Sequence, residues 1–193
     1  MPSFYKQKIR TLMRKLRQEH PALERKAKSA KITEMLVATK EWQQAKTILL
    51  YYPKDGEVDT KEAIDAGLSK KKMVCLPSTD KKSGTITAYK ITCLENLQTA
   101  AFGIPEPKKE QENEIAPEKI DLIIVPGIAF DVHANRVGHG HGYYDKFLAA
   151  ANNAKKVALA FDFQVVPEKI VCESHDVTVD QIITEKRHIV SKK

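Results

Sequence analysis

Three short runs of this 193-residue chain are apolar at every position: ILLYY at residues 48–52, LIIV at 122–125 and VALAF at 157–161. A strand with one solvated face alternates apolar and polar residues, so continuous apolar runs are typical of strands buried on both faces. Segments with helical character separate the strand-like runs, and this alternation favours a parallel sheet. We therefore predict an α/β fold, a three-layer α/β/α sandwich around a mostly parallel sheet, in a single domain over residues 1–193.

Hydrophobic periodicity and helix signals give the expected elements. We expect strands at 47–52, 73–76, 85–91, 121–125, 157–161 and 177–183. Helices are expected at about 3–20, 21–40, 60–70, 95–101 and 143–151. The charged stretch 108–119 is expected to be a surface loop within the domain, because a core strand follows it.

Composition limits the setting and the partners. No run approaches the roughly 18 apolar residues that a membrane span needs, and the N-terminus lacks an apolar signal core. Three cysteines lie far apart without a CxxC motif, which favours a reducing cytoplasm over a disulfide framework. We expect a cytoplasmic monomer. Its formal charge of +7 favours an anionic partner without choosing between nucleic acid, phosphate ligands and a polyanionic metabolite.

The segment after the run at 122–125 carries the strongest functional pattern. It contains Arg136 and three alternating glycines, followed by an expected helix whose first turn is Tyr143, Tyr144 and Asp145. Such glycines leave backbone N–H groups uncovered at a helix start, and a guanidinium binds phosphate oxygens in pairs. We predict a nucleotide-phosphate site here. A tight structural turn would explain the glycines about as well, and a structural salt bridge would explain Arg136.

Two carboxylates are candidates for magnesium. Asp145 lies in the first helical turn, where the helix dipole also favours any acid, and Asp176 is a second candidate that could equally be a turn residue. The histidines at 133, 139, 141 and 175 form no HExxH or paired-cysteine pattern, so we expect no transition-metal site.

The first helix separates its basic residues. Lys6, Arg10, Arg14 and Arg17 fall close together on a helical wheel, beside an apolar stripe. Such a ridge could lay cations along a phosphate chain, and Lys6 and Arg10 are the candidates. We expect Arg17, like Lys8 and Lys15, to be solvated.

A second loop, PKDGEVDT, follows the strand at 47–52. Ligands of parallel sheets bind beyond the carboxyl ends of strands, so this loop and the glycine segment should face one crevice. Glu57 could accept hydrogen bonds from amino groups of a heterocycle, or be an exposed turn acid. Phe102 could stack on a flat ligand, or pack in the core.

Residues 121–148 resemble the signature of the 5-formyltetrahydrofolate cyclo-ligase family, also called 5,10-methenyltetrahydrofolate synthetases. The family pattern is an apolar strand, P-G-x-x-F-D, a short spacer and R-[LV]-G-x-G-x-G-Y-Y-D. Here it reads PGIAFD, then RVG and GHGYYDKF. KQKIR at 6–10, GEVDT at 56–60 and AFGIPEP at 101–107 resemble further family segments in the family's order.

The resemblance implies a ligase that converts 5-formyltetrahydrofolate, polyglutamylated or not, into 5,10-methenyltetrahydrofolate. By the same resemblance, the reaction depends on ATP and Mg²⁺ and releases ADP and phosphate. The resemblance also implies phosphorylation of the formyl oxygen before ring closure. Carried over by position, the catalytic residues are Lys6, Arg136 and His141; the ATP contacts are Lys6, Arg10, Arg136, Gly138, His139, Gly140, His141, Gly142, Tyr143 and Tyr144; the folate contacts are Tyr52, Glu57, Phe102, His139 and Tyr143; and the magnesium ligands are Asp145 and Asp176.

This chain departs from the family pattern at His139 and His141, where other members often carry arginine, lysine or glycine. Either His141 is protonated beside the phosphates, or Lys6 and Arg136 neutralise more of their charge. Two other classes compete with this interpretation. A basic nucleic-acid-binding module fits the net charge but has no interleaved aromatic pattern, and we expect no nucleic-acid partner. A sugar-phosphate isomerase or acyl-CoA transferase would fit the fold alone.

Overall fold

The computed structural model describes residues 2–100 and 103–191. Within that part of the chain the main sheet has eight strands in the order β13-β12-β10-β7-β1-β2-β3-β6. Neighbours from β12 to β2 pair in parallel, while β13, β3 and β6 pair antiparallel. The predicted α/β class with a mostly parallel sheet is confirmed. The strands are β1 (Thr47–Leu49), β2 (Met73–Asp80), β3 (Thr85–Lys90), β6 (Glu114–Ile115), β7 (Leu122–Val125), β10 (Lys155–Leu159), β12 (Gln181–Ile183) and β13 (His188–Val190).

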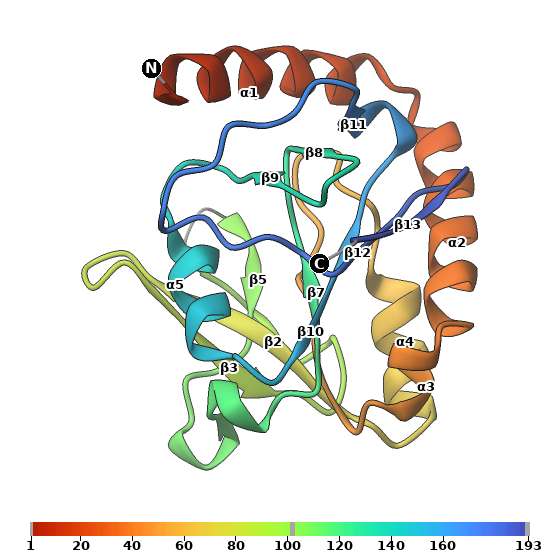
Figure 1. The fold of residues 1–193 in the computed structure, drawn as a ribbon. Coiled ribbons are helices and arrows are strands. Elements are labelled where there is room, and N and C mark those ends of the chain that lie inside the picture. The colour runs from red at the N-terminus through yellow and green to blue at the C-terminus, as the bar shows by residue number, and fades with distance from the viewer. Residues whose placement is uncertain (1, 101–102, 192–193) are drawn as a thin grey trace.

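Helices cover both faces of this sheet (Figure 1). Side chains of the central strands alternate between two cores: Ile48 and Leu50 pack with α2 and α4, while Leu49 packs with α5. Both cores are apolar, which is why the central strands lack polar positions. The helices are α1 (Pro2–Glu19), α2 (Ala22–Val37), α3 (Lys40–Gln44), α4 (Lys61–Ser69) and α5 (Tyr143–Ala150). None in the described chain is long and apolar enough to cross a bilayer.

The first helix, α1, lies across the end of the sheet at which β7 leads into β8 (Figure 1). Its apolar stripe packs on a small third core through Ile9 and Met13. That core includes strands β8 (Ala129–Asp131), β9 (Arg136–Val137) and β11 (Val165–Val166), which form a separate small sheet. The helix is therefore fixed over the carboxyl ends of the parallel strands, with its basic residues beside them.

Several predicted boundaries were wrong. Residues 95–101 were predicted to be helical. Residues 95–100 instead contain a turn and strand β4 (Gln98–Thr99), which pairs with β5 (Pro105–Glu106), and residue 101 lies outside the described residues. A seven-residue helix gains too little to offset its nucleation, and the hairpin offers pairing instead. The loop predicted at 108–119 contains β6, which extends the sheet edge. The helix predicted at 21–40 ends at Val37 as α2, and a separate helix, α3, begins at Lys40, where the Thr39 hydroxyl accepts a hydrogen bond from the Trp42 amide.

Candidate active site

A cavity of about 410 Å³ opens at the carboxyl edge of the parallel strands. The two loops predicted to face one crevice, after Tyr52 and after Val125, both line it, as do α1 and a segment near Asp176. It contains the predicted site residues Lys6, Arg10, Tyr52, Glu57, Arg136, Gly138, His139, Gly140, His141, Gly142, Tyr143, Tyr144, Asp145 and Asp176. Phe102 lies outside the described residues. The sheet thus brings together side chains that are up to 170 positions apart in sequence.

The glycine-rich loop has the backbone geometry expected of an anion site. Gly142 precedes α5 in the left-handed region at φ 69°, and Gly140 has φ +106°, conformations that strain other residues. The amides of His139, Gly140 and Gly142 donate no hydrogen bond to the described part of the chain. Uncovered N–H groups at a helix start attract negatively charged oxygen.

Arg136 lies under this loop and is 7% exposed. Its Nη2 donates to Asp145 Oδ1 over 2.7 Å, and its Nη1 donates to the Pro126 carbonyl over 3.3 Å. A Cβ added at Gly138 would come within 2.8 Å of Nη1, so the guanidinium would have to shift to make room for it. Arg136 therefore both forms a salt bridge and lines the cavity. The two interpretations of this residue from the sequence, a structural salt bridge and a phosphate contact, do not exclude each other.

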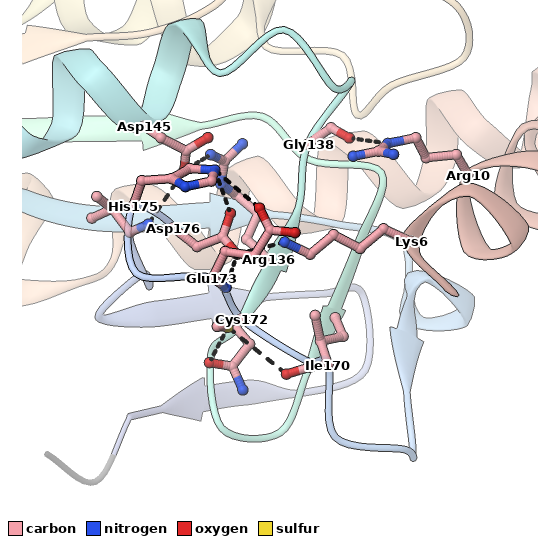
Figure 2. A network of polar contacts seen from close by, with 12 residues as sticks. Lys6, Arg10, Arg136, Gly138, Asp145, Ile170, Cys172, Glu173, His175 and Asp176 are labelled. Atoms are coloured by element: carbon pink, nitrogen blue, oxygen red, sulfur yellow. Dashed lines mark hydrogen bonds and ion pairs between the residues drawn. The ribbon is translucent and has the colours of Figure 1, made fainter. Parts of the chain in front are cut away.

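A second ion pair joins α1 to the segment that carries Asp176 (Figure 2). Lys6 Nζ lies 2.5 Å from Asp176 Oδ2, and both side chains are mostly buried. Burial alone would raise the pKa of the Asp176 carboxyl, but hydrogen bonds from Lys6 and from the Glu173 amide outweigh it and hold that pKa below its ordinary value. Arg10 Nε donates to the Gly138 carbonyl over 2.8 Å, which ties α1 to the glycine loop.

The chemistry of these carboxylates fits magnesium. The Oδ1 atom of Asp145 accepts from Arg136 and from the Val177 amide, and the Oδ2 atom of Asp176 accepts from Lys6 and Glu173. Each acid thus has one strongly engaged oxygen, and both residues line the same cavity. Magnesium takes one or two carboxylates and completes its shell with phosphate oxygens and water. Among the described residues, no group of three His, Cys, Asp or Glu side chains is arranged to hold a metal alone.

Glu57 also lines the cavity, and its side chain is only 8% exposed. Its Oε1 is 3.2 Å from His139 Nε2, and its Oε2 accepts from the Lys54 amide over 3.1 Å. The alternative of an exposed turn acid is thereby excluded. The contact with His139 also links the two strand-end loops directly.

The prediction that Arg17 is solvated was wrong. This residue is 3% exposed, donates from Nη2 to the Gly127 carbonyl, and places Nη1 4.0 Å from Glu57 Oε1. On an isolated helix its position would face water. The loops after β1 and β7 close over it instead, which only the tertiary arrangement reveals.

Aromatic side chains line the apolar part of the cavity. Tyr143 stacks on His141 with ring centroids 5.3 Å apart, and Tyr52 is half-buried. The Tyr144 hydroxyl is buried without a hydrogen-bond partner in the described chain. Burial first, and then the neighbouring Glu57 carboxylate, raise the pKa of Tyr144 and of Tyr51. Both phenols are therefore neutral at the pH of a cell.

Sequence reasoning missed several residues that line the cavity. Glu106 is 3% exposed and accepts from the Ser78 hydroxyl over 2.8 Å. Lys54, Glu173 and His175 also line the cavity. The IPEP segment was considered as a family-like segment and for its aromatic neighbour, and Glu106 was not singled out. Its acidic residue between prolines was the available signal, and nothing in the pattern of 173–175 separated it from an ordinary turn.

The fold and the site place the chain in the class of α/β proteins with a charged small-molecule cavity at the carboxyl edge of the sheet. Within that class, the family model described as the 5-formyltetrahydrofolate cyclo-ligase family matches residues 3–185. The chain belongs to this family and is a ligase. The resemblance seen in the sequence is thereby confirmed.

Relatives match over nearly their whole length. A 5-formyltetrahydrofolate cyclo-ligase of Haemophilus influenzae is 33% identical, over 92% of this chain and 96% of its own. A probable 5-formyltetrahydrofolate cyclo-ligase of Caenorhabditis elegans is 30% identical, over 96% and 93%. The structure of Aquifex aeolicus 5,10-methenyltetrahydrofolate synthetase aligns with a TM-score of 0.86 at 33% identity, over 97% of this chain and 93% of that one.

Proposed function

We propose that this enzyme converts 5-formyltetrahydrofolate, ATP and Mg²⁺ into 5,10-methenyltetrahydrofolate, ADP and phosphate. One observation carries the proposal beyond family membership. The same cavity is lined by a loop with uncovered amides and by three cations, together with a mostly buried carboxylate and aromatic rings. The first set suits a polyphosphate, and the second suits a flat heterocycle with amino groups.

The proposed reaction has two steps. The formyl oxygen attacks the γ-phosphorus, the bond to the β-bridging oxygen breaks, and ADP leaves. Nitrogen 10 then bonds to the activated formyl carbon, the carbon–oxygen bond breaks, and phosphate leaves with the former formyl oxygen. The proton on nitrogen 10 is released. These steps require alignment and charge neutralisation more than covalent help from the protein.

The phosphate side of the cavity supplies that neutralisation. Lys6, Arg10 and Arg136 would contact the triphosphate together with the glycine-loop amides and His141. In the described structure, Lys6 and Arg136 are each paired with an acid. We propose that both exchange these carboxylates for phosphate oxygens. Lys6 and Arg136 then neutralise the transferred group, together with any contribution from His141.

Asp145 and Asp176 would hold the magnesium ion. When bound, such an ion screens the phosphate charge and fixes the position of the phosphates. When Lys6 and Arg136 turn to the phosphates, Asp176 and Asp145 lose their basic partners and become available to a cation. The magnesium ion would then replace the two basic groups as the partner of these carboxylates.

The folate side would be formed by Tyr52, Glu57, Phe102, His139 and Tyr143. Glu57 would accept hydrogen bonds from the amino groups of the heterocycle, and the rings would cover its faces. A polyglutamate tail would extend out of the cavity toward solvent. We also propose that the enzyme acts as a monomer in a reducing cytoplasm, in keeping with its three free cysteines.

The test is a mixture of the purified protein with ATP, Mg²⁺ and 5-formyltetrahydrofolate. We expect the near-ultraviolet absorbance of the methenyl product and one ADP for each product formed. No absorbance change and no ADP release would refute the proposal. Turnover in the absence of ATP would indicate an isomerase or transferase instead.

A further inference from the structure

Arg17 is a buried cation that does not line the cavity. It lies behind Glu57 on the last part of α1, and its side chain is 3% exposed. Its Nε atom has no hydrogen-bond partner in the described chain. Burying a guanidinium with an unsatisfied N–H costs stability, so folding alone does not explain its presence.

The contacts of Arg17 join the two walls of the site. One amino group binds the Gly127 carbonyl, in the turn that follows β7. The other faces Glu57 Oε1 at 4.0 Å, in the loop that follows β1. Strands β1 and β7 are adjacent in the sheet. Arg17 therefore fixes the distance between the two strand-end loops that form the cavity.

The Glu57 carboxylate is held from three directions. Its oxygens meet the Arg17 guanidinium from behind, the Lys54 amide from its own loop, and His139 from the glycine loop. His139 is 41% exposed at the rim, and its contact is the one that an entering ligand can displace. Arg17 and the Lys54 amide would then keep the carboxylate aimed at the ligand.

We propose that Arg17 is a positioning residue that holds Glu57 in place to recognise the amino groups of the folate heterocycle. The inference rests on the proposed function. The residue touches no reacting atom and acts only through Glu57. Because Glu57 is a proposed folate contact, the loss of Arg17 should weaken folate binding and leave ATP binding and the chemical step intact.

Steady-state kinetics separate this role from a merely structural one. We expect Arg17→Gln to raise KM for 5-formyltetrahydrofolate about tenfold, while kcat and KM for ATP change by less than about twofold. Arg17→Lys keeps the charge and should recover most of the loss. The matched control is Arg14→Gln, one turn earlier on the exposed side of α1, which should leave all three constants unchanged.

A double-mutant cycle shows whether Arg17 acts through Glu57. In a Glu57→Gln background, Arg17→Gln should add less than about a twofold further rise in KM for folate. If Arg17→Gln alone is too unstable to purify, this comparison still stands, because the double variant leaves neither charge buried and unpaired.

Two results would overturn the inference while leaving the proposed function intact. One is wild-type turnover with an unchanged KM for folate in Arg17→Gln. The other is a full tenfold loss that persists in the Glu57→Gln background. A wild-type protein with no turnover would remove the proposed function and this inference together.

Discussion

Replacing Lys6 by methionine tests the phosphate side of the site most directly. The substitution keeps an unbranched apolar side chain of nearly the same length and removes the ammonium group with its charge and hydrogen bonds. Lys6 is 6% exposed, and its Nζ is 2.5 Å from Asp176 Oδ2. Breaking a fully buried pair costs about 3–5 kcal/mol. Asp176 keeps its hydrogen bond from the Glu173 amide at 2.6 Å. We therefore expect Lys6→Met to lower the free energy of unfolding by about 2 kcal/mol.

The effect on ATP follows from the same geometry. A hydrogen bond between a charged donor and phosphate contributes about 1.5–3 kcal/mol, or roughly ten- to a hundredfold in affinity. Lys6 must first leave Asp176, which places the expected loss near the lower end. We therefore expect KM for ATP to rise about tenfold, with KM for 5-formyltetrahydrofolate nearly unchanged.

The assay measures initial rates against ATP at saturating folate, with a thermal melt of each variant. About 2 kcal/mol corresponds to a Tm lowered by about 4–8 °C in a chain of this size. Lys8→Met is the matched control, because Lys8 is exposed and its ammonium lies over the Phe4 ring. An unchanged KM for ATP in Lys6→Met, or an equal rise in Lys8→Met, would refute the reasoning.

Three further predictions concern the same ion pairs. The pKa of Asp176 is lowered in the folded protein, so its ionised form stabilises the fold at pH values above the ordinary pKa of a carboxyl group. That contribution is lost as pH falls below about 4, and urea titrations should show a flatter pH dependence in Asp176→Asn. Gly138→Ala should cut turnover about tenfold or more, because the added methyl group displaces the Arg136 guanidinium; normal kinetics would contradict this. Asp145→Asn should raise the Mg²⁺ concentration needed for half-maximal rate more than it lowers Tm, and an unchanged magnesium titration would exclude Asp145 as a ligand.

The sequence by itself determined the sheet and the location of the site. Apolar runs without polar positions can only be buried on both faces, so the parallel centre of the sheet followed from them. Loops that follow parallel strands meet at one edge of the sheet. The sequence alone therefore predicted that Glu57 and the glycine segment face the same crevice. Residue type and spacing also made Lys6 and Arg136 candidates for binding phosphate and Asp145 a candidate for binding magnesium.

Only the tertiary structure decided which charges face each other. No local pattern pairs Lys6 with Asp176 at a separation of 170 residues, or turns Arg17 from a solvated residue into a buried support for Glu57. The pairing of β4 with β5 likewise took the place of the predicted short helix. Strand pairing stabilises this segment more than helix propensity can, because a helix of so few residues does not offset its nucleation cost. Periodicity reports whether a side chain is buried by its own element. Burial of a charge by a neighbouring loop depends on how distant segments close together, and that information is not local.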